Sequence, residues 1–293
     1  MDLDELRETQ NIDDRRGQGA GGFGGFGPRM AFGGGGLGLV AVVVVSLLFG
    51  VDPSQLLGGL NGGQAIAPVD QPQDQSAGPG GPRPDDAAYA FSRKIVGSAE
   101  DVWTVLLRQQ GVNFSPATLT VYDAVTPTGC GTGQASAGPF YCPSDRRIYL
   151  DLSFFNELGD RFGAPGEFAR AYVIAHEYGH HIQNLLGVMD SHQTGERGAS
   201  GDSVRTELQA DCYAGVWAYH ANRQFHILQT GDVEQGLQAA SAVGDDTLEK
   251  QAQGYAVPDS FTHGSSAQRM RWFQRGLQGG DMAACDTFSA RSL

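Results

Sequence analysis

The spacing of hydrophobic and polar residues predicts both strands and helices. Apolar and polar positions alternate at 118–125 (TLTVYDAV) and at 147–152 (RIYLDL), and a period of two is typical of half-buried β-strands. Residues 88–110 instead place apolar side chains three or four positions apart, with Ile95 and Val102 on one side of an amphipathic helix. From this pattern we expect a domain that contains both a sheet and helices.

Helical spacing dominates the chain after residue 156. We expect the main helices at 166–186, 203–224, 232–253 and 264–278. Gly187 suits the position that ends the first of them, because glycine readily adopts the left-handed conformation found after a helix. One or two strands followed by several helices predict an α+β domain, mostly helical with a small sheet, rather than a repeating βαβ sheet.

A long uncharged stretch precedes the expected domain. Residues 31–51 (AFGGGGLGLVAVVVVSLLFGV) carry no charge, and their Val- and Leu-rich part at 37–49 favours a lipid-spanning helix. A cleaved signal peptide is an alternative, but a long tail precedes the apolar run and no small-x-small cleavage site directly follows it. A buried core helix is a second alternative, which the Gly-rich flanks argue against. We expect an N-terminal single transmembrane helix.

Positive charge around this stretch predicts its orientation. Arginines precede it, whereas the first basic residue after it is Arg83. The positive-inside rule therefore predicts a single-pass protein of the cell membrane, with a cytoplasmic N-terminus and an extracytoplasmic domain. The expected organisation is a disordered cytoplasmic tail at 1–30, a membrane anchor at 31–51, a Gly/Pro/Gln-rich flexible linker at 52–86 and a folded domain at 87–293.

Composition and charge narrow the classes of function. Nearly half of the 43 glycines lie before residue 87, and most of the aromatic residues lie after it. The formal net charge is −13, and lysine occurs only at Lys94 and Lys250. Nucleic-acid binding normally needs a cationic surface that displaces counterions from phosphate, so we exclude nucleic acid as a partner.

Four cysteines outside a reducing compartment are normally oxidised. Cys130 and Cys142 bracket a Gly/Ser-rich loop that closes easily, which leaves Cys212, on a predicted helix, to pair with Cys285. Three connectivities are available to four cysteines, and four free thiols are a further alternative. We favour the pairs Cys130–Cys142 and Cys212–Cys285. A zinc site of four thiolates is disfavoured because no Cys-x-x-Cys occurs.

The segment 174–186 carries the most specific chemical signal. Its HEYGH sequence at 176–180 fits the pattern H-E-x-x-H. Residues four apart lie on one face of a helix, so that His176 and His180 can reach one metal ion while Glu177 acts on a water beside it. A surface helix with several histidines is the alternative, but the apolar neighbours indicate burial, and metal ligation compensates buried polar groups. We therefore predict one catalytic zinc ion, Zn²⁺.

Tetrahedral catalytic zinc needs a third protein ligand. The pattern HExxHxxGxxH is absent, because Leu186 stands where its third histidine would be. Glu207 is the candidate, and Asp211, one helical turn later, is placed to accept a hydrogen bond from a ligating histidine and orient its ring. The alternative is an exposed acidic pair on a helix, which the upstream motif disfavours.

Four separated blocks resemble one family. They are CGTGQASAGPFYCPSDRRIYLDLSFF at 130–155, HEYGHH at 176–181, ELQADCYAGVWA at 207–218 and SFTHGSSAQRMRWF at 260–273. In this order they are similar to the membrane-anchored bacterial neutral zinc metallopeptidases, over residues 88–290 and in the plan of tail, span and linker. The resemblance implies a zincin-like fold, with a HExxH helix beneath a small sheet whose edge strand receives extended substrate. It also implies zinc ligation by His176, His180 and Glu207, with Glu177 as the general base.

His263 lies within the last of these blocks. With Arg269 it is also similar to the His-x5-Arg sequence near the end of membrane zinc peptidases of the CAAX-processing and heat-shock type, in which the histidine faces the scissile carbonyl oxygen. A His-Gly pair at a helix entry can donate to an oxyanion, but it can equally cap the helix. We expect a catalytic role for His263, with Tyr255 as a lesser candidate. We interpret the other histidines as structural or surface residues: His181, His192, His220 and His226.

These residues predict a membrane-tethered zinc-dependent endopeptidase that hydrolyses extracytoplasmic proteins with a metal-activated water. Glu177 is expected to take the water proton and pass it to the leaving amine, and strand 147–152 to add the substrate as an extra strand. The alternatives are a zinc-stabilised binding module without catalysis, and a zinc amidase that acts on cell-wall peptides. The intact Glu177 argues against the binding module.

Overall fold

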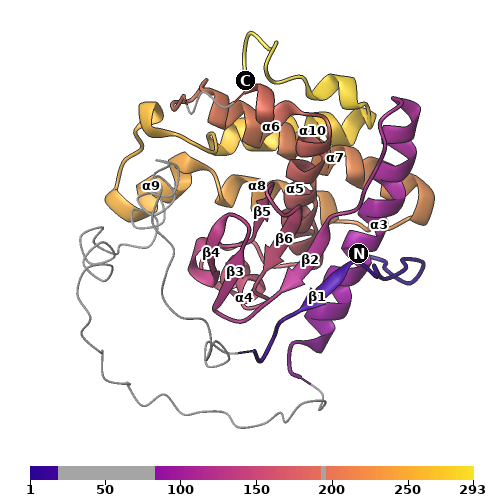
Figure 1. The fold of residues 1–293 in the computed structure, drawn as a ribbon. Helices are drawn as coiled ribbons and strands as arrows, with labels where there is room; N and C mark the ends of the chain where they lie inside the picture. The colour runs from indigo at the N-terminus through magenta and orange to yellow at the C-terminus, as the bar shows by residue number, and fades with distance from the viewer. Residues whose placement is uncertain (19–82, 193–195) are drawn as a thin grey trace, which may run out of the picture.

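The computed structural model describes residues 1–18, 83–192 and 196–293, which form an α+β structure with a small sheet packed against helices (Figure 1). The four-stranded sheet has the order β1 (Ile12–Asp14), β2 (Thr118–Val121), β6 (Arg147–Leu150) and β5 (Phe140–Cys142). β1, β2 and β6 are parallel, and β5 is antiparallel to β6. A separate hairpin pairs β3 (Val125–Thr128) with β4 (Gly131–Gln134).

Helices form most of the described chain and match the helical spacing of the sequence. The α-helices are α3 (Asp86–Gln109), α4 (Phe154–Asp160), α5 (Glu167–Leu185), α6 (Val188–Ser191), α7 (Asp202–Phe225), α8 (Asp232–Ala242), α9 (Asp245–Gln253) and α10 (Ser266–Gly279). The short 3-10 helices are η2 (Ala135–Ala137), η3 (Pro258–Ser260) and η4 (Met282–Cys285). Gly187 follows α5 with a φ of 71°, which is the left-handed conformation expected there.

The single helix expected at 232–253 is two helices. α8 ends at Ala242, and α9 begins at Asp245 after extended backbone at Gly244. The Asp245 carboxylate accepts hydrogen bonds from the backbone N–H groups of residues 262–264. Because the helix is interrupted here, Asp245 lies at the start of α9 and its carboxylate anchors the loop that carries His263.

Residues 1–18 belong to the fold, so the expectation of a disordered tail is wrong for them. β1 pairs with β2 in the register Ile12↔Leu119, and the chain before it crosses α3. A Cβ at Gly97 of α3 would lie 2.3 Å from the Arg7 carbonyl oxygen, which shows how closely the two segments approach. Within the structure, the buried Glu100 carboxylate accepts hydrogen bonds from the side chains of Arg7, Thr9 and Asn11.

The expected membrane topology is also wrong. In the part of the chain that the structure describes, no helix is long and apolar enough to cross a membrane. Residues 12–14 and 119–121 are neighbours in one sheet, so they cannot lie on opposite sides of a bilayer as a cytoplasmic N-terminus and an extracytoplasmic domain would. The expected anchor at 31–51 and the linker up to residue 82 lie outside the described residues.

α5 runs through the interior and carries the HEYGH sequence. It contacts α3, α7, α8 and β5, and its residues 171–183 are all buried. This position explains the apolar neighbours of the motif. Gly179 allows the close approach of α7, because a Cβ there would lie 2.9 Å from the Ala210 carbonyl oxygen. Gly276 does the same between α10 and α7, where a Cβ would meet the Cys212 carbonyl oxygen at 1.9 Å.

Two disulfides hold peripheral segments to this framework, with the connectivity that we favoured. Cys130–Cys142 joins the turn between β3 and β4 to the end of β5, and Cys212–Cys285 joins α7 to η4. Both cysteines of the second pair are fully buried.

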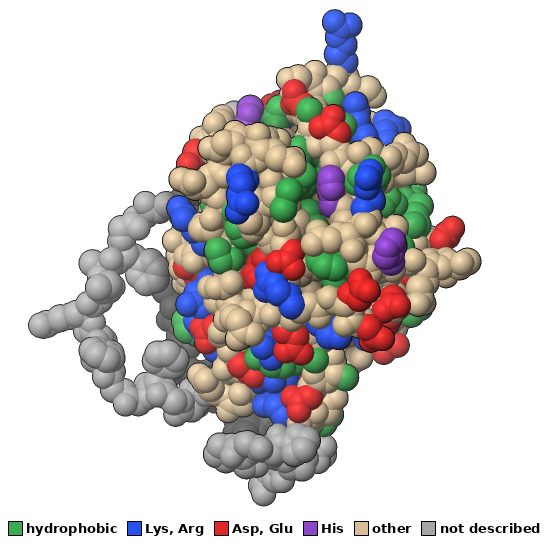
Figure 2. Space-filling view, turned by 90° about the vertical axis from the view of Figure 1, so that its right-hand side faces the viewer, with side chains coloured by type: hydrophobic (Ala, Val, Ile, Leu, Met, Phe, Trp, Pro, Cys, Tyr) green, Lys and Arg blue, Asp and Glu red, His purple; other side chains and the backbone are tan. Residues whose placement is uncertain are grey.

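Acidic and basic side chains lie close to one another on the surface. Figure 2 shows one face of the molecule, on which the two signs of charge are interspersed. Arg16 illustrates the pattern, since it pairs with Asp14, Asp85 and Asp86. Local pairing of this kind offsets part of the acidic excess where the N-terminal residues meet α3.

Candidate metal centre

Two helices bring His176, His180 and Glu207 together. The histidines lie one turn apart on α5, and Glu207 faces them from the first turns of α7. The Nε2 atom of His176 is 3.1 Å from one Glu207 carboxylate oxygen, and that of His180 is 3.5 Å from the other. One donor atom from each residue lies within 4.8 Å of the others, which is close enough for one ion to contact all three.

The donor set fits zinc. Two imidazole nitrogens and one carboxylate oxygen are the ligands of one common type of catalytic zinc site, which leaves a coordination position for water. Both histidines are buried, and Glu207 is partly buried. Burial raises the pKa of Glu207, but the adjacent His180 and hydrogen bonds with both histidines outweigh burial and hold this pKa well below its ordinary value. Glu207 is therefore ionised at neutral pH, as an oxygen ligand of zinc must be.

Asp211 orients His176, as its spacing from Glu207 predicts. An Asp211 carboxylate oxygen is 2.8 Å from His176 Nδ1. An ionised carboxylate only accepts, so His176 carries a proton on Nδ1, and Nε2, the atom beside Glu207, is the one that can bind a metal. Burial alone would lower the pKa of His176, but the charge and hydrogen bond of Asp211 raise it to about 10. Metal binding at Nε2 must therefore displace a proton.

Arg269 and Tyr172 complete the surroundings of Asp211. Arg269, from α10, donates from Nε and Nη2 to the two Asp211 oxygens, both at 2.9 Å, and the Tyr172 hydroxyl donates to the same carboxylate at 2.5 Å. The sequence resemblance linked Arg269 to His263, but the structure pairs its guanidinium with Asp211, the carboxylate that contacts the candidate ligand His176. Nothing in the sequence indicated this pairing with Asp211.

Gln183 contacts the second histidine and was missed by the sequence reasoning. Its Oε1 atom is 2.8 Å from His180 Nδ1. The signal was present, because Gln183 lies three residues after His180 and therefore on the same face of α5.

Glu177 lines the same cleft as the three candidate ligands. Its side chain is buried, and burial raises the pKa of its carboxyl group while the neighbouring His176 and His180 lower it; the net shift is upwards. A carboxylate with a raised pKa beside a metal-ligand set is the arrangement that general-base catalysis requires.

His263 lines the cleft together with the three candidate ligands, whereas Tyr255 does not line it. The His263 side chain is 36% exposed, and its Nδ1 atom lies 3.2 Å from an Asp245 oxygen. Burial lowers its pKa, but the hydrogen bond with Asp245 and the negative charge of Glu207 raise it above the ordinary value. Tyr255 is 62% exposed.

The other histidines have structural surroundings. His181 is fully buried between the Tyr141 hydroxyl and the Ser115 carbonyl, and burial lowers its pKa to about 4. The remaining three lie away from the cleft lining: His192 stacks on Phe288, His220 donates to the Gly280 carbonyl, and His226 ends α7.

The cleft has a volume of about 450 Å³ and a largely apolar wall. Residues 137–141 of the segment that enters β5 line it, as do Phe154 and Phe162, whose rings contact each other. A cleft of this size and character is typical of a ligand-binding site.

Comparisons with known proteins agree with this geometry. The family model described as "Putative neutral zinc metallopeptidase" matches residues 1–288, which include the N-terminal strand as well as the ligand helices. The chain is 46% identical over 288 residues to "Uncharacterized protein YpfJ" of Escherichia coli (strain K12), with 96% of each protein covered. It is 47% identical over 206 residues to "Uncharacterized protein Rv2575" of Mycobacterium tuberculosis (strain H37Rv), with 67% of this chain and 69% of that protein covered. No solved structure matches. The chain therefore belongs to the neutral zinc metallopeptidase family.

Proposed function

We propose that the protein is a zinc-dependent endopeptidase that hydrolyses peptide bonds of protein or peptide substrates. The observation that carries this proposal is the set of His176, His180 and Glu207 donor atoms within 4.8 Å of one another, in a cleft that Glu177 also lines. Zinc held by these three side chains supplies Lewis acidity to the attacking water and to the scissile carbonyl.

Glu177 is the proposed general base. It accepts a proton from the water that attacks the carbonyl carbon and delivers that proton to the nitrogen of the leaving amine. Its burial supports this role, because a raised pKa lets one carboxyl group both take up and release a proton near neutral pH.

His263 is the proposed donor to the oxygen of the tetrahedral intermediate. Asp245 accepts at the His263 Nδ1 atom, so Nε2 is left to face the cleft. The raised pKa favours the protonated ring, which is a stronger hydrogen-bond donor.

The substrate strand must pair with β5 rather than with residues 147–152. The sequence expectation for 147–152 is wrong, because β6 already has β2 on one side and β5 on the other. Among the described residues β1 and β5 are the two edge strands of the sheet, and β5 is the one that reaches the cleft, which residues 139–141 line. An extended peptide added to this edge runs past the candidate ligands with its backbone hydrogen-bonded.

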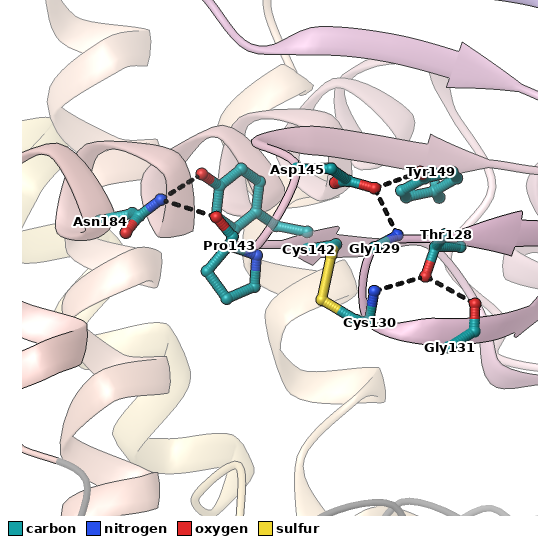
Figure 3. The surroundings of a disulfide bond; sticks show 10 residues. Thr128, Gly129, Cys130, Gly131, Cys142, Pro143, Asp145, Tyr149 and Asn184 are labelled. Carbon is teal, nitrogen blue, oxygen red and sulfur yellow. Dashed lines mark hydrogen bonds between the residues drawn. A yellow bond between two sulfur atoms is a disulfide. The ribbon is translucent and has the colours of Figure 1, made fainter. Parts of the chain in front are cut away.

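Asn184 ties β5 to α5, the helix that carries the two candidate histidine ligands. It lies one turn after His180, and its side-chain amide donates to the Tyr141 hydroxyl at 2.8 Å and to the Pro143 carbonyl at 3.4 Å (Figure 3). The Cys130–Cys142 disulfide restrains the same end of β5 from the other side. Disulfides persist in oxidising compartments, which favours substrates found there.

Glu177→Gln tests the proposal. The variant keeps the size of the side chain and all three candidate ligands, so it should bind zinc with unchanged stoichiometry and lose hydrolysis of a peptide library by at least about 100-fold. Glu234→Gln, on the exposed surface of α8, is the matched control and should retain full activity. Equal cleavage by wild type and Glu177→Gln would overturn the assignment of the base. Zinc binding without cleavage of any peptide by the wild type would favour a non-catalytic binding module.

A further inference from the structure

A chain of buried amide hydrogen bonds connects His180 to the Cys212–Cys285 disulfide. Gln183 Oε1 contacts His180 Nδ1 at 2.8 Å, and Gln183 Nε2 donates to Gln209 Oε1 at 3.0 Å. Gln209 Nε2 in turn donates to the Cys285 carbonyl at 3.0 Å. Gln183 is 0% exposed and Gln209 is 6% exposed, so water does not compete for these bonds.

The direction of this chain is fixed by groups that can only accept. The Cys285 carbonyl has no proton, so the Gln209 amide must present its NH₂ group there and its oxygen to Gln183. Gln183 must then present its NH₂ group to that oxygen and, at 2.8 Å, to the Thr206 carbonyl. Reversing either amide would place two acceptor oxygens against each other at about hydrogen-bond distance, at a cost typical of an unsatisfied buried polar group.

The fixed direction of the Gln183 amide determines the tautomer of His180. With both protons of its NH₂ group donated, Gln183 has only its oxygen left to face the ring. That oxygen accepts from Nδ1–H, so the lone pair of the neutral ring is on Nε2, the atom that faces Glu207. His176 is oriented by the Asp211 carboxylate, whereas His180 is oriented by the neutral amide of Gln183, which Gln209 holds in turn.

We propose that Gln183 is the positioning residue for His180. The hydrogen-bonded pair Gln183–Gln209, here called the relay, makes the metal affinity of the site depend on the Cys212–Cys285 disulfide. The disulfide holds η4 against α7 and thereby keeps the Cys285 carbonyl in place as the acceptor that sets the direction of the relay. Breaking it frees the carbonyl, so the Gln209 amide loses its fixed direction and only the Thr206 carbonyl still directs Gln183. His180 is then held less firmly in the geometry that presents Nε2. The inference rests on the proposed zinc site.

The test is a zinc titration of the full chain by competition with a chromophoric chelator. Gln183→Met removes the acceptor from His180 while keeping an unbranched side chain, and should weaken zinc binding about 10–100-fold. Gln209→Met should weaken it less, because the Thr206 carbonyl still directs Gln183. Gln251→Met, exposed on α9, is the control and should bind zinc like the wild type.

The double variant separates a relay from general loss of packing. If Gln209 acts through Gln183, Gln209→Met has no further effect on zinc affinity in the Gln183→Met background, whereas independent structural effects add. The visible absorption spectrum of the Co²⁺-substituted chain should change in Gln183→Met and stay unchanged in Gln251→Met, since it reports the geometry of the ligands. Additive losses, or equal zinc affinity of Gln183→Met and wild type, would overturn the relay.

The two disulfides provide a matched pair of variants for the coupling. Replacing Cys212 and Cys285 by serine should lower zinc affinity, whereas replacing Cys130 and Cys142 should not, because that disulfide has no bond to the relay. Equal effects of the two replacements would overturn the coupling. A wild-type chain that binds no zinc would instead overturn the proposed zinc site itself. The glutamine variants decide the inference even where the Cys212/Cys285 variant does not fold.

Discussion

Arg269 offers the sharpest test of the arrangement behind the candidate ligands. Arg269 is 4% exposed. Its guanidinium donates to both Asp211 oxygens, to the Tyr172 hydroxyl at 3.3 Å and to the Val243 carbonyl at 3.2 Å. Arg269→Met keeps an unbranched apolar stem but removes the charge and every donor. Asp211, which is 0% exposed, then remains as a buried carboxylate without its cation.

The expected loss is large compared with the stability of a domain. Removing one partner of a buried ion pair costs about 3–5 kcal/mol, against a typical free energy of unfolding of about 5–15 kcal/mol. A loss of 1 kcal/mol lowers the midpoint of thermal unfolding by about 2–4 °C in a domain of this size. The midpoint of Arg269→Met should therefore fall by roughly 6–20 °C.

Denaturant and thermal unfolding of three variants give the test. Arg269→Met and Asp211→Asn should each destabilise the protein, and the double variant should lose less than the sum, because it leaves no unpaired charge. Arg275→Met is the control, since this arginine lies on the exposed side of α10 and should cost within about 0.5 kcal/mol. An Arg269→Met variant no less stable than Arg275→Met, or additive losses, would refute the reasoning.

Further predictions concern the packing of α5 on α7, the packing of the N-terminal residues on α3, and the loss of stability at acidic pH. Gly179→Ala should weaken zinc binding in a chelator competition assay, because its Cβ forces α5 and α7 apart; Gly279→Ala, with nothing within 4 Å, should not. Gly97→Ala should cost about 1–3 kcal/mol and speed proteolysis within residues 1–18, and unchanged protection would contradict the close packing on α3. Burial raises the pKa of Asp245, but hydrogen bonds from His263 and the loop N–H groups lower it below 3.8. This contribution to stability is present above pH 3.8 and is lost as the pH falls through the lowered pKa; Asp245→Asn should weaken the acid dependence of unfolding.

The sequence predicts the parts of the site that depend on helical periodicity. His176 and His180 share a face because they are four residues apart, and Glu207 and Asp211 do so for the same reason. When α5 packs against α7, both members of each pair therefore lie at the contact between the two helices. The Cys130–Cys142 disulfide could likewise be predicted from the sequence, because the two cysteines are only 12 residues apart and the loop between them closes locally.

The rest depends on contacts between residues far apart in the chain. β1 has only three residues and pairs with a strand more than a hundred positions away, so its sequence gives no alternation from which to predict it. Arg269 reaches Asp211 across the contact between α10 and α7, where Gly276 allows the two helices to approach closely. The central position of β6 likewise follows from the packing of β5 and β2, which the alternation at 147–152 does not specify.

X-ray absorption at the zinc edge tests the central claim most directly. The measurement uses the full chain loaded with zinc and its Glu207→Ala variant. We predict one zinc per chain, with nitrogen and oxygen ligands at about 2.0–2.2 Å, no sulfur, and loss of stoichiometric zinc in the variant. Sulfur ligands at about 2.3 Å, or a zinc site unchanged by Glu207→Ala, would contradict the claim that His176, His180 and Glu207 hold the ion.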